Sequence, residues 1–451
     1  MSTRGGEQTR RSFLAAAGAL SLSALISGCR RAPGAETDEA EELPEVRLPP
    51  PPVRGAGRHA GARLVFYAES VGIGAAIDRA LAQRFARDTG AAVEVVLRPR
   101  DATETYASYL RLFQARSAAV DVLSLDIVWP GIFAPHLLDL GEALGGLAAT
   151  HLEAAIRNDT VQGRLVAMPY FTDFGMLYYR TDLLQKYGFG APPTTWDELE
   201  RMAKTIQSGE RARSRAFAGF VWQGKAYEGL TCNALEWIHS YGGGAILEGR
   251  EPTINNPRAA QALARFHRFV GTISPIGVTG YEEEDARNVF QGGNAAFMRN
   301  WPYAYAAGNT KGSRIEGLFD VAPLPHEPGF ESSATLGGWT LGISKYSRFP
   351  DAATAFVGYL CSPEVQRFRA LVGGYIPTIP AVQSDPDVAR VLPFLERVRG
   401  ATLVARPSNQ AGARYNEVSI AFYQGVSKAL YGTDPEKALE QIDRRIRRSL
   451  R

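Results

Sequence analysis

The chain of 451 residues contains few of the residues that build metal or redox centres. It has three cysteines, and its six histidines are dispersed. Cys232 and Cys361 lie in no CxxC pair, and no HExxH motif occurs, so the spacing of a zinc site is missing. We therefore expect no cofactor and no metal. The pair Cys232 and Cys361 fits either one disulfide or two buried free thiols.

Strong net charge of either sign is also missing. Lys and Arg number 50 against 47 Asp and Glu, a formal net charge of +3. Nucleic-acid-binding proteins usually carry a basic excess or stripe, so no nucleic-acid partner is expected. Two short basic clusters are best interpreted as solvated helix or loop faces: Arg211, Arg213 and Arg215, and Arg444, Arg445, Arg447 and Arg448.

Motifs of common catalytic sites are absent as well. The chain has no GxxxxGK[ST] and no GxSxG. Gly72-Ile73-Gly74 follows a predicted strand, but Ile77 stands where a dinucleotide-binding loop needs a third small residue. We therefore expect that the protein is not an enzyme. A secreted carbohydrate hydrolase that uses Asp126 and Asp173 as its two carboxyl groups remains an alternative.

The first residues form a predicted export signal. Thr9-Arg10-Arg11-Ser12-Phe13-Leu14 matches a twin-arginine signal, and the apolar stretch up to Ile26 is too short for a permanent membrane span. It ends in Ile26-Ser27-Gly28-Cys29, which resembles a lipoprotein cleavage and acylation site. We predict a signal peptide over 1–28 and lipidation of Cys29; an uncleaved membrane anchor is the alternative.

Residues 29–61 are rich in Pro, Glu, Ala and Gly and include Pro49-Pro50-Pro51-Pro52. Such a composition buries little apolar area and favours extended conformations. We predict a disordered, lipid-anchored tether over 29–61.

From residue 62 the pattern predicts alternating strands and helices. Apolar runs at 64–67, 93–97 and 121–127 are separated by helical periodicity near 77–90 and 101–116. A β-α-β-α-β order predicts a parallel sheet with helical crossovers. Ligands bind beyond the carboxyl ends of such strands, and the residues there are polar: Glu69-Ser70, Arg98 to Asp101, and Asp126. Asp126 can also be a turn or helix-capping residue.

The second half has its own signals. Thr195-Trp196-Asp197-Glu198 predicts a capping box, and Asn256-Pro257 predicts the start of another helix. Strands are expected at 216–222, 319–324 and 336–344, and helices near 351–370, 411–430 and 434–449. No internal repeat is present.

Several aromatic and polar side chains have the chemistry of a sugar site. Aromatic faces stack on the C–H faces of sugars, and Asp, Glu and Arg pair with vicinal hydroxyls. Ordinary core packing of the aromatic residues is the alternative. The candidate residues are Asp173, Trp301, Tyr303, Gly337, Gly338, Trp339 and Arg406.

From about residue 62 onward, several long segments resemble the sugar-binding family of extracellular solute-binding proteins, and within it the trehalose/maltose-binding type that serves ABC importers. The matching segments are LDIVWPGIFAPHLLDL (125–140), DFGMLYYRTDLLQKYG (173–188), PPTTWDELERMAKTIQSGER (192–211), GFVWQGKAYEGL (219–230), FQGGNAAFMRNWPYAY (290–305), VAPLPHEPG (321–329) and ATLGGWTLGISKYS (334–347).

The resemblance implies an α/β, two-lobed periplasmic-binding-protein fold (type II-like). Each lobe is then a mostly parallel sheet flanked by helices, with the ligand cleft between the lobes. Chain crossings are expected near 172–176, 334–340 and 376–380. The N-terminal lobe would comprise 62–172 and 339–378, and the C-terminal lobe 173–338 and 379–451.

The resemblance also implies the site. Asp126 and Asp173 would accept hydroxyl protons, Trp301 and Tyr303 would stack on a ring, and Arg406 would donate to sugar oxygens. Gly338 and Trp339 would line the site, and Glu228 would support the site or the fold. The family usually places an acidic residue in the loop after the first strand. Here that loop has none, and Glu69 is the candidate substitute.

The implied function is capture of an α-linked disaccharide of the trehalose or maltose class for an ABC permease. The protein is expected to be a monomer at the outer face of the cytoplasmic membrane, held by acylated Cys29. The alternatives are the same fold with another sugar, polyol or oligosaccharide, and a surface lipoprotein that senses or adheres without an importer.

Overall fold

The computed structural model describes residues 47–50, 58–398 and 400–451. The predicted signal peptide, the twin-arginine pair and Cys29 lie outside these residues. Within the described part, no helix combines the length and the apolar character that a membrane span needs.

The first sheet has six strands, and its core is the predicted β-α-β-α-β run. Strand β1 pairs in parallel with β2 and with β3, so that Phe66 faces Val95 on one side and Val122 on the other. The strand order is β12-β11-β3-β1-β2, with β6 paired to β11. The bounds are β1 Arg63–Ala68, β2 Ala92–Leu97, β3 Val122–Asp126, β6 Ala167–Phe174, β11 Ser333–Ile343 and β12 Thr402–Val404.

Helices of the expected kind cover this sheet. Helix α1 ends where Gly90 takes a left-handed conformation (φ +82°), which glycine adopts without a Cβ clash. Helix α2 is capped by Asp101, which accepts from the backbone N–H groups of Thr103 and Glu104. The bounds are α1 Gly74–Thr89, α2 Ala102–Gln114, α3 Pro130–Phe133, α4 Gly141–Ala148, α5 Glu153–Asp159, α12 Pro350–Leu360 and α13 Pro363–Gly373.

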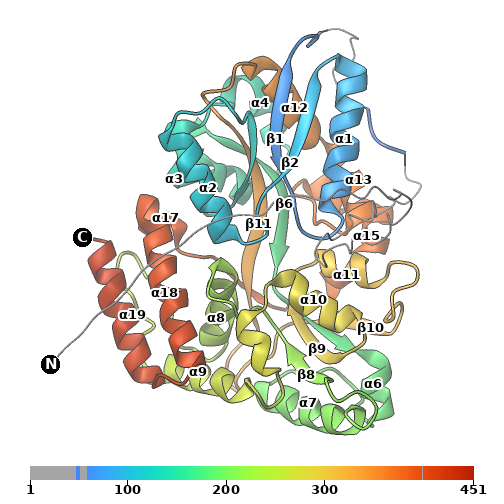
Figure 1. The fold of residues 1–451 in the computed structure, drawn as a ribbon, viewed down its shortest axis with the longest axis vertical. Coiled ribbons are helices and arrows are strands. Elements are labelled where there is room, and N and C mark those ends of the chain that lie inside the picture. Colours follow the sequence, from blue (N-terminus) through green and yellow to red (C-terminus); the bar gives the residue numbers. More distant parts are fainter. Residues whose placement is uncertain (1–46, 51–57, 399) are drawn as a thin grey trace, which may run out of the picture. The chain divides into compact units, whose positions relative to one another are not determined.

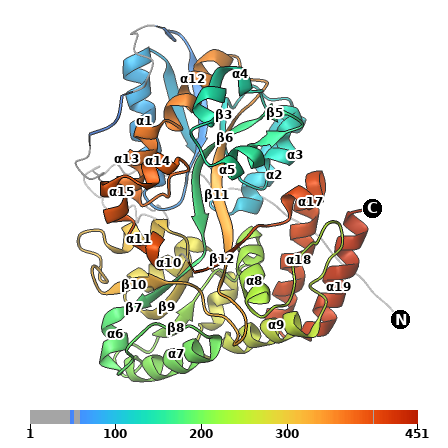
Figure 2. The same cartoon turned by 180° about the vertical axis from the view of Figure 1, so that it is seen from behind.

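The antiparallel strands β6 and β11 connect the first sheet to the second. Figures 1 and 2 show both strands running through the middle of the folded body. β6 continues through Gly175 directly into β7 of the second sheet, and Thr172 forms an isolated bridge with Ile376. These segments lie at the three expected crossings, and we propose that the lobes divide there.

The second sheet has the order β10-β7-β9-β8. It differs from the expected mostly parallel sheet, because β7 pairs antiparallel with both β9 and β10 and only β8 and β9 are parallel. The reason is that β7 enters as a continuation of β6 instead of through a helical crossover. The bounds are β7 Met176–Arg180, β8 Ala218–Val221, β9 Ala295–Asn300 and β10 Phe319–Ala322; β4 Thr160–Val161 and β5 Arg164–Leu165 form a separate hairpin.

The remaining helices complete the chain, and most of them lie beside the second sheet. The predicted capping box is present at the start of α7, where Thr195 and Glu198 exchange hydrogen bonds. The α-helical bounds are α6 Thr181–Lys186, α7 Trp196–Glu210, α8 Glu228–Ser240, α9 Pro257–Phe269, α10 Glu283–Gln291, α11 Tyr303–Gly308, α14 Pro380–Gln383, α15 Pro386–Val391, α16 Phe394–Arg397, α17 Ser408–Ala411, α18 Tyr415–Leu430 and α19 Pro435–Ser449. Short 3-10 turns occupy Ala134–His136, Ile276–Gly280 and Gly412–Arg414.

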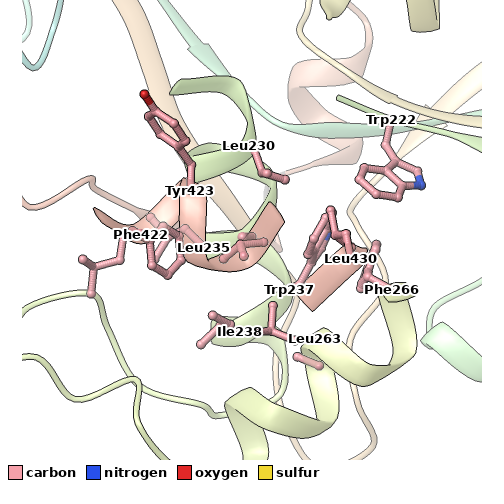
Figure 3. Packing of buried hydrophobic residues seen from close by; sticks show 14 of the residues in the cluster. Trp222, Leu230, Leu235, Trp237, Ile238, Leu263, Phe266, Phe422, Tyr423 and Leu430 are labelled. Atoms are coloured by element: carbon pink, nitrogen blue, oxygen red, sulfur yellow. The ribbon is translucent and has the colours of Figure 1, made fainter. Parts of the chain in front are cut away.

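A dense aromatic core holds α8, α9 and α18 together (Figure 3). Trp237 stacks on Phe266 with 3.6 Å between ring centroids, and Trp222 meets Trp237 edge-on at 4.9 Å. Each such buried ring contributes roughly 2–3 kcal/mol through removal of its apolar surface from water. This core fixes the start of α8, where Glu228 lies, and the start of α18.

Two sequence-based expectations are refined here. Cys232 and Cys361 are both buried free thiols, so the disulfide alternative is wrong. In addition, two described residues of the predicted 29–61 tether, Pro49 and His59, contact the folded body. The Pro49 carbonyl accepts from the Tyr359 hydroxyl, and the His59 ring stacks on Phe85.

Candidate ligand-binding site

A cavity lies between the two sheets at the carboxyl ends of β1, β2 and β3. Its lining atoms leave about 670 Å³ of space, part of which is open to solvent. All nine residues predicted from the sequence line this one cavity: Glu69, Asp126, Asp173, Glu228, Trp301, Tyr303, Gly338, Trp339 and Arg406.

Arg406 is the centre of a buried ion-pair network. Its two terminal nitrogens bind the Asp126 carboxylate at 2.9 and 2.6 Å, and Nη1 also reaches Glu228 Oε1 at 2.9 Å. Glu228 in turn accepts from the Tyr415 hydroxyl and from Ser419 Oγ. Burial opposes the charge of Arg406, but the carboxylates around it prevail and raise its pKa. Glu228 therefore orients the Arg406 guanidinium, and Arg406 in turn fixes the orientation of the Asp126 carboxylate at the cavity.

Asp173 differs from these groups because its carboxyl has no partner. The residue is 8% exposed, and no donor in the described part of the chain hydrogen-bonds to its oxygens. Burial, and then the negative charge of Glu69, raise the pKa of Asp173 well above its usual range. The Asp173 oxygens are not among the fully buried atoms without a partner, so they are open to the cavity, where a ligand hydroxyl can bind them.

The two tryptophans of the cavity each carry a guanidinium on one ring face. Arg299 lies 3.9 Å from the Trp301 ring centroid, and Arg98 lies 3.5 Å from the Trp339 ring centroid. Trp129 meets Trp339 edge-on, so Trp339 supports Arg98 and the cavity wall. Trp301 is therefore the better placed of the two to stack on a ligand ring.

Acidic residues at the start of α10 hold the aromatic rings from behind. Glu283 accepts from Trp301 Nε1 at 3.3 Å and from the Tyr227 hydroxyl at 2.6 Å. The neighbouring Glu284 accepts from the Tyr303 hydroxyl at 2.6 Å. Burial raises the pKa of Glu283 despite these donors. The polar ends of the three aromatic residues are thus occupied, which fixes the positions of their rings at the cavity wall.

Glu69 turns toward its own loop. Its Oε1 accepts from the backbone N–H groups of Ser70 and Val71, at 2.8 and 3.1 Å, and from Arg98 Nη2 at 2.5 Å. The loop it stabilises contacts the other side of the cavity: a Cβ on Gly72 would lie 2.7 Å from Tyr303 Cδ2. Glu69 therefore lines the cavity while its Oε1 stabilises the loop.

Sequence reasoning missed several lining residues. Arg98, which follows β2 directly, was recognised as a polar residue at a strand end but was not named as a site residue. Tyr227, Glu283 and Tyr375 gave no comparable signal, because their place at the cavity depends on helix packing. Among the described residues, no cluster of His, Cys, Asp and Glu has the make-up of a metal site.

Two sheets joined by long crossing strands, with a polar and aromatic cavity between them, define a two-lobed ligand-binding protein. Residues 67–367 match the family model of the bacterial extracellular solute-binding proteins. The chain belongs to this family, and it is of the ABC sugar importer type.

Individual relatives agree with this assignment. The chain is 46% identical over 390 residues to a Deinococcus radiodurans protein described as a probable ABC transporter-binding protein, covering 85% of this chain and 93% of that one. It is similar to the maltose-bound structure of T. maritima MalE3, with a TM-score of 0.80 and 38% identity over 86% of this chain and 99% of that one. A mannitol-binding protein of Pseudomonas aeruginosa is 25% identical over 232 residues, 49% of this chain and 52% of that protein.

Proposed function

We propose that the protein captures an α-linked disaccharide of the trehalose or maltose class and delivers it to an ABC permease. The observation that carries the proposal is the unpartnered carboxyl of Asp173 in a cavity that also contains the Trp301 ring. A carboxyl group that lacks donors beside a ring that can stack on C–H groups suits a polyhydroxylated ring. The similarity to a maltose-bound protein supports the same class.

The proposed mechanism needs no chemistry on the ligand. The sugar contacts Asp126 and Arg98 at the first lobe and Trp301 and Tyr303 at the second. Contacts to both lobes stabilise the closed arrangement more than the open one, and only this difference shifts the equilibrium. The closed form is then the one that a permease receives.

Isothermal titration calorimetry of the full chain with trehalose, maltose, sucrose, glucose and mannitol tests the proposal. We expect micromolar or tighter binding of at least one α-linked disaccharide and weaker binding of glucose. Absence of heat with every compound would overturn the sugar assignment. Tight binding of mannitol alone would favour the polyol alternative, which the mannitol-binding relative supports.

A hydrolase that uses Asp126 and Asp173 is disfavoured by the ion pair. Asp126 is held by both terminal nitrogens of Arg406, so neither oxygen is free to act as a nucleophile without breaking that pair. Incubation of the protein with maltose and trehalose, followed by analysis for released glucose, distinguishes the two. We expect no release.

We also propose that the chain is exported by the twin-arginine route and anchored through acylated Cys29 on the outer face of the cytoplasmic membrane. The motif order in the sequence supports this. Mass spectrometry of the N-terminal peptide tests it: a diacylglyceryl group on Cys29 is expected, and an unmodified cysteine would exclude the anchor.

A further inference from the structure

The segment before the folded body makes specific contacts with it. The Leu48 carbonyl accepts from Arg84 Nη1 at 3.1 Å, and the Pro49 carbonyl accepts from the Tyr359 hydroxyl at 2.7 Å. Leu48 also packs against the buried hydrophobic cluster that contains Phe85 and Tyr359. Because Arg84 lies on α1 and Tyr359 on α12, two neighbouring carbonyls of one segment are bound by two different helices.

Contacts within the folded body hold the two donor groups, the Arg84 guanidinium and the Tyr359 hydroxyl, in place. Arg84 is held by Asp88 one helical turn away, with Nε 2.6 Å from the carboxylate. Tyr359 is fully buried and stacks on Phe85, with its hydroxyl directed at Pro49. Since burial raises the pKa of Tyr359, the hydroxyl stays protonated and can donate.

The sequence of the segment suits this mode of binding. Residues 49–52 are four consecutive prolines. Proline-rich segments favour an extended helix without internal hydrogen bonds, so their carbonyls are free to accept from a partner. Because proline is already restricted, little conformational entropy is lost when the segment docks on an aromatic-lined surface.

We propose that Leu48-Pro49-Pro50 is a docking segment that the first lobe binds between α1 and α12, so that the free tether ends at Arg47. Eighteen residues then separate Cys29 from the docked point, with a maximum reach of about 65 Å, against about 115 Å for a tether that is free up to residue 61. The shortened reach rests on the proposed acylation of Cys29, whereas the docking itself does not.

Limited trypsin digestion of the full chain tests the docking. The Arg47–Leu48 bond precedes the docked residues, and the Arg31–Ala32 bond serves as an internal reference. If cleavage at Arg47 requires release of the segment, its rate follows the released fraction. The measured quantity is the ratio of the two cleavage rates by mass spectrometry.

Two variants release the segment in different ways. Tyr359→Phe removes one hydrogen bond and should raise the ratio about five-fold. Leu48→Asp leaves the folded body unaltered and should raise it more than ten-fold, because a charged side chain replaces the packed Leu48. Tyr431→Phe, the same substitution at a tyrosine that is 71% exposed, should leave the ratio unchanged.

An equal ratio in the unaltered chain and in Leu48→Asp would overturn the proposal, whatever the effect of Tyr359→Phe on folding. Sugar binding should remain unchanged in all three variants, because none of the altered residues lines the cavity. An unmodified Cys29 would exclude the membrane anchor and leave the docking result as it stands.

Discussion

At the scale of single residues, Asp173 differs from the other carboxyl groups of the cavity in its partners. The neighbouring carboxylates Asp126, Glu228 and Glu69 are each paired with an arginine. Asp173 has no such partner and is slightly more exposed than they are, at 8%. Burial raises the pKa of its carboxyl, and the proposed role of Asp173 is to bind a ligand hydroxyl.

Asp173→Ala should separate binding from stability. We expect sugar affinity to fall about 10- to 100-fold, since the hydroxyl that Asp173 binds would lose its acceptor. The melting temperature of the ligand-free protein should stay the same or rise, because the substitution removes a buried carboxyl that has no partner. Calorimetry and thermal unfolding measure the two effects.

The matched control is Asp351→Ala, at an exposed carboxylate outside the cavity, which should leave the affinity unaltered. Unchanged affinity in Asp173→Ala would remove Asp173 from the ligand site. A large loss of ligand-free stability would instead show that its carboxyl supports the fold.

At the scale of elements, the crossing strands β6 and β11 contain a buried hydrogen-bond chain. Thr340 Oγ1 of β11 lies 2.7 Å from the Met168 carbonyl of β6 and 2.5 Å from Asp159 Oδ2 at the end of α5. One hydroxyl proton cannot serve two acceptors. The geometry is satisfied when Asp159 is protonated and donates to Thr340, which then donates to Met168. In agreement, burial raises the pKa of Asp159 to about 7.

This chain predicts a pH dependence of stability. Because the folded-state pKa of Asp159 is raised above that of the unfolded chain, its contribution is fully present at low pH and is lost as the pH rises toward 7. The shift from 3.8 to about 7 corresponds to at most about 4 kcal/mol. Urea unfolding between about pH 5 and pH 8 should show this decline in the unaltered protein.

In Asp159→Asn the free energy of unfolding should depend less on pH than in the unaltered protein, because the Asn amide can donate to Thr340 at every pH. The difference between the two proteins isolates Asp159 from other buried carboxyl groups such as Asp78 and Glu236, whose pKa values burial also raises. Parallel pH profiles for the two proteins would contradict the protonated hydrogen-bond chain.

At the scale of the whole molecule, Lys225 bridges the two sides of the cavity. Its Nζ lies 3.0 Å from Asp101 at the start of α2, beside the first sheet, and also contacts Glu282 at the start of α10, beside the second. The backbone N–H of Glu228 donates to Thr103 Oγ1 across the same gap. We expect these contacts to stabilise the closed arrangement of the two lobes, in addition to the contacts that a ligand makes.

Lys225→Met should weaken sugar binding about two- to five-fold, since a partly exposed ion pair is worth at most about 1 kcal/mol. Higher salt should reduce the affinity of the unaltered protein and have less effect on the variant. Lys204→Met, which removes the exposed pair with Glu200 within α7, is the matched control. Equal affinities for Lys225→Met and the unaltered protein would show that the bridge is not coupled to closure.

Much of the fold was predictable because its signals are local. The β-α-β-α-β run, the capping box of Thr195 and the helix start at Asn256 follow from periodicity and capping chemistry within a few residues. The residues of the cavity were also predictable as a set, because polar groups at strand ends and matched family segments both pointed to them.

The pairing of those residues was decided only by the tertiary structure. Whether Glu69 contacts a ligand or its own loop depends on Arg98, 29 positions away, and the environment of Asp126 depends on Arg406, 280 positions away. Periodicity and capping act over one or two turns of chain, whereas hydrogen bonding and burial depend on which distant side chains meet. The sequence alone therefore determined the elements, the family and the composition of the site. Only the folded chain determined that Glu69, Asp126 and Glu228 are each paired with an arginine, whereas Asp173 is not.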